Sequence, residues 1–330
     1  MKVILQRTTG GPEVMEVCEA PIPEPRDNEV LIEAEALGVG QPDVLIRKGI
    51  YKWMPPLPAN PGNDLAGRIA ALGPGISGLA IGQKVLLSAR DLAQRGGCYA
   101  EYVAVPADAV HALPESVDLE QAAALPNYQV AYALLHETAG PRIPRSVLVI
   151  GAAGGVGSAL VQLAKAAGMT VIGTVSGTDK ARFARAMGAD HIVNYREQPV
   201  PEATLDLTGG KGVDLVLDHV GGPAFTGYLA ALANWGTLVS YNAFGGLPEK
   251  DLFAEMRAHV GRSPAVRCFS FHSYDHDREG RRRLMGAVIG KLAAGAIRPA
   301  IGARFRLADV HQAHALLEGG TALGKIVMHP

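Results

Sequence analysis

A run of small residues near the middle of the chain has the spacing of a dinucleotide-binding turn. It is Ala152-Ala153-Gly154-Gly155-Val156-Gly157, the pattern GxGxxG with Ala in the first glycine position. Gly154 lets the backbone approach a pyrophosphate, and Gly157 lets the next helix pack closely on the preceding strand. The first N–H groups of that helix and the positive end of its dipole both favour phosphate. The run therefore predicts a site for dinucleotide phosphates.

The elements on both sides of this turn are those that the motif requires. Residues 146–150 form a short apolar run, typical of a parallel strand covered on both faces. After the turn, apolar side chains recur at helical spacing: Val156, Ala159, Leu160, Leu163 and Ala164. A glycine-rich turn also occurs as a purely structural feature of other α/β proteins. Because strand, turn and helix follow in order, we favour dinucleotide binding.

The second strand of this unit ends without a carboxylate. Enzymes that use NAD place an acidic residue there, about 20 residues beyond the glycines, to bind the ribose 2′-hydroxyl. Here the strand ends Gly173-Thr174-Val175-Ser176. A carboxylate would repel a 2′-phosphate, whereas Ser176 and Lys180 offer it a hydroxyl and a cation. The pattern favours NADPH, and the alternative for Lys180 is a solvated helix residue.

The bulk properties are those of a two-domain globular protein. The chain has 330 residues, of which 48% are hydrophobic, enough for two domains with large cores. A net charge of −1 gives no general attraction to nucleic acid or to a membrane, and we expect neither as a partner. We find no signal-peptide pattern and no apolar run long enough to span a bilayer. The cysteines, Cys18, Cys98 and Cys268, are far apart in sequence, which favours a reducing, cytoplasmic location.

The chain changes character near residue 120. Before that point, short strands alternate with Gly and Pro turns, which is typical of a mostly antiparallel, barrel-like domain. After it, strands and helices alternate and predict a doubly wound parallel sheet. The expected strands are 146–150, 170–175, 191–193, 213–218, 237–242 and 266–271, and the helices that follow the glycine-turn helix are 179–187, 223–234 and 249–260.

The tail does not continue this alternation. Helices at 278–294 and 307–318 and a closing strand at 325–328 are expected there. We therefore assign residues 1–122 and 272–330 to one catalytic domain and residues 123–271 to an inserted nucleotide-binding domain. The active site is expected in the cleft between them.

Segments along the whole chain match a known family. They are GGPEV (10–14), IRKGIY (46–51), PPLPANPGNDLAG (55–67), EQAAALP (120–126), GAAGGVG (151–157), GADHIVNYRE (188–197), GVDLVLDHVGG (212–222) and GKIVM (324–328). With these segments the chain resembles the zinc-independent, zeta-crystallin-like quinone oxidoreductases of the medium-chain dehydrogenase/reductase superfamily. The resemblance implies an α/β fold, with a Rossmann doubly wound sheet inserted in a GroES-like, mostly antiparallel β-barrel catalytic domain. It also implies NADPH and a homodimer.

The resemblance implies hydride transfer from NADPH to a quinone or another conjugated carbonyl. Tyr51 and Asp43 are the candidate proton donors, and solvent is the alternative to both. Tyr195 matches the residue that flanks the adenine ribose phosphate, and the segment 269–271 would contact the carboxamide. The implied cofactor-binding residues include the glycine turn with Ala153, Gly155 and Val156, and also Thr174, Ser176 and Lys180. The others are Gly40, Tyr51, Val130, Tyr195, Val220, Tyr241, Asn242, Ala243, Phe269, Phe271 and Lys325. Core packing is the alternative for the two phenylalanines, and a surface position is the alternative for the lysine.

Two features narrow the chemistry. Zinc-containing members of the superfamily use a Cys near Gly40 and a Gly-His-Glu motif near residues 62–64, and this chain has neither. A tetrahedral zinc site cannot be built there without thiolate or imidazole ligands, so we expect no metal. The pairs His272/His276 and His311/His314 are expected to be surface or capping histidines.

The other feature is a pair of departures from the family pattern. Gly40 stands where the family usually has Asn, and Val130 where it usually has Thr; both family residues can hydrogen-bond the cofactor near the reacting ring. Two alternatives to quinone reduction therefore stay open. One is an ene-reductase of α,β-unsaturated ketones or acrylates, and the other is a non-catalytic NADPH-binding protein. A homodimer is expected through the apolar, otherwise unpaired strand at 266–271.

Overall fold

A computed structural model describes residues 1–140 and 142–330. Contacts divide the chain into two compact units. Unit 1 is Met1–Pro126 with Met285–Pro330, and unit 2 is Asn127–Leu284. The domain boundaries expected from the sequence stay a prediction, because compactness alone does not define a folding domain.

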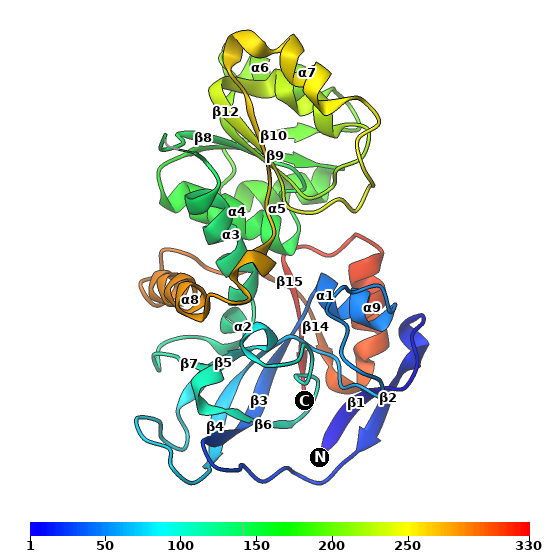
Figure 1. Ribbon diagram of the computed structural model, residues 1–330, viewed down its shortest axis with the longest axis vertical. Helices are drawn as coiled ribbons and strands as arrows, with labels where there is room; N and C mark the ends of the chain where they lie inside the picture. Colours follow the sequence, from blue (N-terminus) through cyan, green and yellow to red (C-terminus); the bar gives the residue numbers. More distant parts are fainter. Residues whose placement is uncertain (141) are drawn as a thin grey trace. The chain divides into compact units, whose positions relative to one another are not determined.

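Unit 1 is built on a seven-stranded sheet with the order β14-β15-β3-β4-β5-β7, in which β6 also pairs with β3 (Figure 1). All these pairs are antiparallel except β14 with β15. The strands are β3 (Glu29–Val39), β4 (Asp64–Leu72), β5 (Lys84–Ser88), β6 (Tyr102–Pro106), β7 (Val110–Ala112), β14 (Ile301–Arg306) and β15 (Lys325–His329). A separate antiparallel pair is formed by β1 (Lys2–Gln6) and β2 (Met15–Glu19).

The core of unit 1 lies between this sheet and the helix α9 (Val310–Glu318). Val310 and Ala313 of that helix are buried in one cluster with apolar side chains of β3, β4, β5 and β15. The short helices α1 (Gln41–Arg47) and α2 (Leu119–Ala122) also belong to unit 1, and the division between the units falls inside α8 (Arg278–Ala293). The core thus joins the N-terminal strands to the C-terminal segment of the chain.

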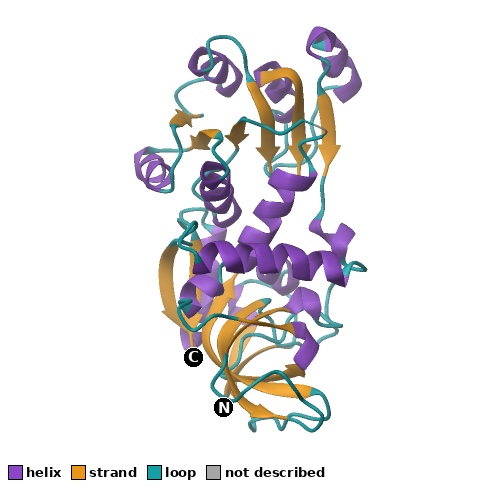
Figure 2. Ribbon diagram, turned by 90° about the vertical axis from the view of Figure 1, so that its left-hand side faces the viewer, coloured by secondary structure: helices purple, strands orange, loops and turns teal. Residues whose placement is uncertain are grey.

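Unit 2 is a six-stranded parallel sheet with the order β10-β9-β8-β11-β12-β13. The order reverses between β8 and β11, and ligands bind at such a switch point, at the carboxyl ends of the strands. The strands are β8 (Ser146–Val149), β9 (Thr170–Val175), β10 (His191–Asn194), β11 (Val213–Asp218), β12 (Leu232–Ser240) and β13 (Ala265–Cys268). The helices are α3 (Leu125–Glu137), α4 (Gly155–Ala166), α5 (Thr178–Ala186), α6 (Val200–Leu207) and α7 (Leu252–Ala258); Figure 2 shows helices around the sheet.

The expected fold class, an α/β protein with a mostly antiparallel β-rich part and a doubly wound parallel sheet, is confirmed. Two expected elements of unit 2 are wrong. The helix expected at 223–234 is a 3-10 helix at Phe225–Ala231, after which β12 begins at Leu232. Leu232 pairs with Val213 across a bulge, so sheet pairing overrides the local helical pattern. The strand expected at 266–271 ends at Cys268, and a 3-10 turn begins at Phe271.

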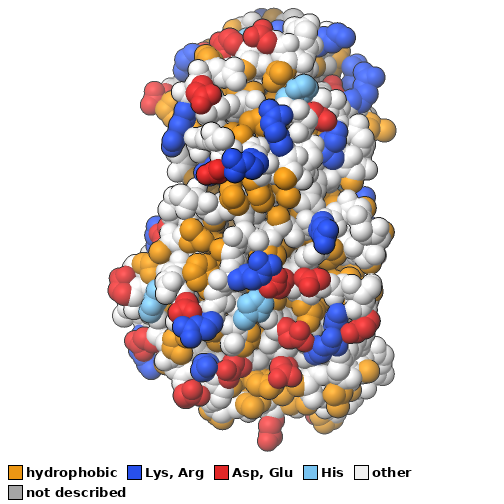
Figure 3. Space-filling model, turned by 180° about the vertical axis from the view of Figure 1, so that it is seen from behind, with side chains coloured by type: hydrophobic (Ala, Val, Ile, Leu, Met, Phe, Trp, Pro, Cys, Tyr) orange, Lys and Arg blue, Asp and Glu red, His pale blue; other side chains and the backbone are white. Residues whose placement is uncertain are grey.

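The surface of the chain carries both signs of charge. On the face shown in Figure 3, acidic and basic side chains are interspersed. None of the helices in the described part of the chain is both long and apolar enough to cross a bilayer. Cys18, Cys98 and Cys268 are free thiols.

Candidate functional site

The glycine turn opens directly onto the N-terminus of α4. The exposed Gly154 is the N-cap residue, and no side chain caps the helix there. A Cβ built on Gly154 would have only the Gly151 carbonyl oxygen within 4 Å, at 3.7 Å, whereas a Cβ on Gly157 would lie 2.1 Å from the same oxygen. Gly157 is therefore needed for packing. Gly154 leaves open space beside helix N–H groups that no side chain caps, as the binding of a phosphate group requires.

The turn is anchored on the side of β9. The Gly151 N–H donates to Oγ1 of the buried Thr174 at 3.0 Å, and the Ala152 N–H donates to the Thr174 carbonyl at 3.0 Å. A Cβ on Gly173 would lie 2.7 Å from the Ala152 Cβ, so this glycine lets the turn reach the strand. Thr174 thus supports the turn through its side-chain oxygen and its carbonyl.

The residues expected to hold a 2′-phosphate lie at the carboxyl ends of two neighbouring strands. Asn194 of β10 pairs with Val175 of β9, and the Tyr195 N–H donates to the Val175 carbonyl at 3.1 Å. Ser176 follows Val175 directly, and Lys180 lies in the first turn of α5. Ser176, Lys180 and Tyr195 therefore all follow strand ends at one edge of the sheet. Tyr195 is 51% exposed.

A second loop meets the sheet at the carboxyl end of β11. Val220 and its neighbours pair with the loop after β12, because the Gly245 N–H donates to the Val220 carbonyl at 2.6 Å and the Gly222 N–H to the Gly246 carbonyl at 2.8 Å. Gly221 and Gly222 adopt positive φ and would clash with this loop if they carried a Cβ. The loop therefore holds three further predicted residues beside Val220: Tyr241, Asn242 and Ala243.

His219 also lies at this edge, and the sequence analysis missed it. It directly follows β11 and precedes Val220, so its place beside the switch point was available from the motif GVDLVLDHVGG. What the motif did not reveal is that its ring lies against Gly151, the residue that opens the glycine turn.

Val130, Phe269 and Phe271 come together in one apolar cluster of unit 2. Phe271 is 5% exposed, packs with Ala133 and Leu284, and stacks on the Tyr274 ring at a centroid distance of 5.2 Å. Val130 and Phe269 pack against the same cluster. The Phe271 side chain is thus a core residue, and any contact with a cofactor is left to its backbone.

In unit 1 the predicted residues lie around a buried pair of aspartates. Asp43 is fully buried in the first turn of α1, where its carboxylate accepts from the Gly40 N–H at 2.8 Å and from Asn63 Nδ2 at 2.6 Å. Burial, and next the charge of Asp64, raise the pKa of Asp43 to about 6. Lys325 is only 3% exposed and donates to Asp64 at 2.6 Å, so it is not a plain surface lysine.

The two remaining predicted residues of unit 1 are less constrained. Gly40 has an extended backbone, and a Cβ there would make only ordinary contacts, the nearest being Pro42 Cδ at 3.5 Å. The Tyr51 ring is half-buried and lies tilted against Trp53 at a centroid distance of 5.6 Å. Position 40 can therefore accept a side chain without disturbing α1.

The residues at the superfamily's zinc positions have other partners here, because Asn63 bonds to Asp43 and Asp64 to Lys325. Within residues 1–140 and 142–330 no group of three His, Cys, Asp or Glu side chains could hold a metal ion. His311 bonds to the Met15 carbonyl at 2.7 Å, and His314 contacts the Tyr99 hydroxyl at 3.2 Å. His314 is fully buried, so the expectation of a surface or capping histidine is wrong for this residue.

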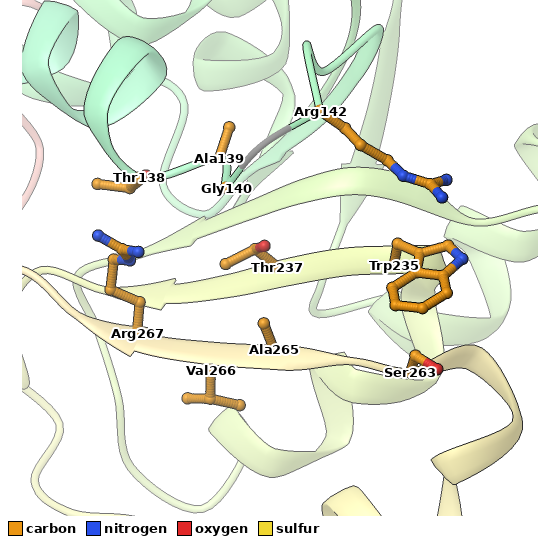
Figure 4. A pocket seen from close by; sticks show the side chains of 10 residues that line it. All are labelled: Thr138, Ala139, Gly140, Arg142, Trp235, Thr237, Ser263, Ala265, Val266 and Arg267. Atoms are coloured by element: carbon orange, nitrogen blue, oxygen red, sulfur yellow. The ribbon is translucent and has the colours of Figure 1, made fainter.

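A pocket of about 280 Å³ lies elsewhere in unit 2 (Figure 4). It is formed by β12, β13 and the segment after α3, and the Arg142 guanidinium lies over the Trp235 ring at 5.0 Å. The other lining residues are Thr138, Ala139, Gly140, Thr237, Ser263, Ala265, Val266 and Arg267. None of them belongs to the predicted cofactor set, so this pocket is separate from the residues that the motif indicates.

The difference between Gly154 and Gly157 gives a first prediction. Gly154→Ala fills the open space without meeting protein atoms, so the thermal midpoint should stay within about 2 °C and NADPH should bind at least about tenfold more weakly. Gly157→Ala should instead lower the thermal midpoint, because its Cβ meets the Gly151 carbonyl. Calorimetry and thermal unfolding of both variants check this. Unchanged NADPH affinity in Gly154→Ala would contradict the assigned phosphate site.

The buried Asp43 gives a second prediction. Its folded pKa of about 6 exceeds the ordinary value of 3.8, so its contribution favours folding at low pH and is lost as the pH rises through 6. Asp43→Asn removes this titration. The stability of the wild type relative to the variant should therefore fall by up to about 3 kcal/mol between about pH 4 and pH 7. Urea unfolding of both proteins measures it, with the exposed Asp27→Asn as control, and a pH-independent difference would refute it.

Comparison with known proteins also indicates a GroES-like domain followed by a dehydrogenase domain. Residues 26–115 match the family described as alcohol dehydrogenase GroES-like domain, and residues 155–278 match the family described as zinc-binding dehydrogenase. A quinone oxidoreductase of Salmonella typhimurium is 33% identical over 97% of each chain. The name of the second family mentions zinc. In this chain, however, Asn63 and Asp64 stand at the superfamily's zinc positions and bond to Asp43 and Lys325.

Three solved structures are similar over the full chain, each covered to 99% or more. They are the quinone oxidoreductase of Escherichia coli complexed with NADPH (30% identity, TM-score 0.86), an NAD-dependent alcohol dehydrogenase (33%, 0.88) and a 2-haloacrylate reductase (27%, 0.81). The glycine turn on a parallel sheet, the antiparallel unit and the end-to-end similarity agree with one another. The chain belongs to the quinone oxidoreductases of the medium-chain dehydrogenase/reductase superfamily.

Proposed function

We propose that this protein is an NADPH-dependent, metal-free oxidoreductase that reduces a quinone or another conjugated carbonyl. The observation that carries the proposal is the open space at Gly154, in front of the uncapped α4. When bound, NADPH supplies the hydride, and the protein supplies position and electrostatics. The relatives named as quinone oxidoreductases support this choice of substrate class.

The preference for NADPH rests on the ends of β9 and β10. Ser176, Lys180 and Tyr195 follow the carboxyl ends of these strands, where we expect the adenine ribose, and the end of β9 carries no carboxylate. Asp179 is nearby, but Arg182 pairs with it at 3.2 Å. The NADPH complex of the E. coli enzyme supports this assignment, whereas the similar NAD-dependent alcohol dehydrogenase keeps NADH as the competing cofactor.

We propose the following residues for the reacting end of the cofactor. We assign the nicotinamide ribose to the loop with Tyr241, Asn242 and Ala243, and the carboxamide to the backbone around Phe269 and Phe271. Gly40, Val130 and Lys325 stay predicted neighbours of the cofactor. Of the two candidate acids we favour Tyr51, with water as the alternative. Both carboxylate oxygens of Asp43 already accept hydrogen bonds that fix the first turn of α1.

A second function is favoured by position 40. Asn is usual there in the family, and Gly40 offers no side chain to orient a quinone or the reacting ring. Together with the similarity to a 2-haloacrylate reductase, this favours reduction of α,β-unsaturated ketones or acrylates as the alternative.

The discriminating experiment is NADPH oxidation with matched panels of quinones, enones and acrylates. Turnover with quinones supports the first function, and turnover with enones or acrylates alone supports the second. NADPH binding without turnover of any substrate would leave a non-catalytic binding protein. The variant Gly40→Asn, which the backbone accommodates, should raise quinone turnover if the missing amide is what limits it.

Cofactor choice gives a third prediction. Ser176→Asp places a carboxylate where the 2′-phosphate should lie, so NADPH should bind at least about tenfold more weakly, whereas NADH should bind within about threefold of the wild type. Thr178→Asp, exposed in the first turn of α5, serves as a control for the added charge. Calorimetric titration with both cofactors measures the effect. An equal loss for NADPH and NADH would count against a 2′-phosphate at this position.

We also propose a homodimer through β13. Among the described residues this strand ends the sheet order, so one of its edges has no partner strand there, and Ala265, Arg267 and Cys268 are exposed. Light scattering should give twice the 34.5 kDa mass of one chain at micromolar concentration. Val266→Lys should weaken the dimer, whereas Val260→Lys, outside the strand, should not. A monomer at that concentration would overturn the proposal.

The cytoplasmic location rests on cysteine usage alone and stays a prediction.

A further inference from the structure

The ring of His219 lies where the glycine turn begins. A Cβ on Gly151 would lie 2.5 Å from His219 Cε1, and Gly151 adopts a φ of +74°. The imidazole therefore takes the place that a side chain at position 151 would need. His219 itself follows the last residue of β11, the strand next to β8 at the reversal of strand order.

The imidazole connects two chain segments. Its Nδ1 lies 3.4 Å from the Tyr241 hydroxyl, and the ring also hydrogen-bonds the backbone of Ile150. Burial lowers the pKa of His219 and raises that of Tyr241, so the histidine is neutral and the phenol keeps its proton. With the phenol protonated and the ring neutral, Tyr241 can donate to Nδ1.

Aromatic packing strengthens the same link. The His219 ring lies 5.7 Å from the Tyr241 ring and 6.0 Å from the Phe244 ring, which it meets edge to face. Phe244 remains 48% exposed. The backbone of the loop is fastened as well, because the Tyr241 N–H donates to the Asp218 carbonyl at 2.9 Å. His219 thus fixes the position of an exposed aromatic side chain at the switch point.

The glycine turn is supported differently on its two sides. Towards β9, Thr174 anchors Gly151 and Ala152 through two hydrogen bonds that do not involve His219. Towards β11 and β12, the imidazole makes the connection. Loss of His219 should therefore leave the phosphate side of the turn in place. It should loosen the Tyr241 and Phe244 side chains, while the backbone hydrogen bonds of the loop after β12 remain.

We propose that His219 is a positioning residue for the nicotinamide half of the cofactor. Its ring ties the start of the glycine turn to the loop after β12 and so holds that loop, with Phe244, at the switch point. The inference rests on the proposed function, because that function supplies the ligand. It assigns to His219 a role distinct from that of Thr174, which supports the phosphate half.

The test compares two ligands on three variants. Adenosine 2′,5′-bisphosphate reports the phosphate half alone, and NADPH reports both halves. His219→Ala should weaken NADPH about tenfold, because it loses both hydrogen bonds, and should leave the bisphosphate within about twofold. His219→Gln, which can still donate to Ile150, and Tyr241→Phe, which loses one bond, should each weaken NADPH by only about threefold. His259→Ala, a histidine elsewhere in unit 2, is the matched control.

Calorimetry gives the affinities, and the fluorescence lifetime of bound NADPH reports how firmly the nicotinamide is held. A shorter lifetime in His219→Ala, partly restored in His219→Gln, is the expected signature. Equal losses for the two ligands, or no loss of NADPH affinity in any variant, would overturn the role of His219. Failure of the proposed function would show differently, as a wild type that does not bind NADPH or turns over no substrate.

Discussion

The contact on which the rest of the site depends is the close approach of α4 to the turn that precedes it. At Gly157 a Cβ would lie 2.1 Å from the Gly151 carbonyl, so only glycine lets the helix begin where it does. With the helix in that place, Gly154 faces open space and the first N–H groups of α4 are free of side-chain caps. The close packing at Gly157 thus leaves the N-terminus of α4, with its free N–H groups and positive dipole end, open to a phosphate.

Parallel pairing then gathers the other residues around this turn. Because all strands of unit 2 end at the same edge of the sheet, Thr174, Tyr195, His219 and Tyr241 meet there although they are far apart in sequence. Unit 1 supplies a contrasting environment, in which Asp43 and Asp64 are buried and accept hydrogen bonds from Asn63, the Gly40 backbone and Lys325. Unit 2 presents backbone N–H groups at the glycine turn, whereas unit 1 holds buried polar side chains.

Much of this follows from sequence, and the failures have physical causes. The glycine turn and the carboxylate-free end at Ser176 are local patterns, so spacing alone predicted them. The 3-10 helix at Phe225–Ala231 was mistaken for part of an α-helix, because the pairing of Leu232 with Val213 is not local. The same holds for His219, whose contact with Gly151 joins the ends of two strands. The burial of Lys325 depends on Asp64, which is 261 residues away.

The central claim is that the turn at Gly154 and the strand ends beside it form a site for NADPH. The most direct test is the ratio of the wild-type dissociation constants for NADH and NADPH, measured by calorimetry in one buffer. The account predicts that NADPH binds at least about tenfold more tightly, because Ser176 and Lys180 meet its 2′-phosphate. Equal affinity, or tighter binding of NADH, would contradict it.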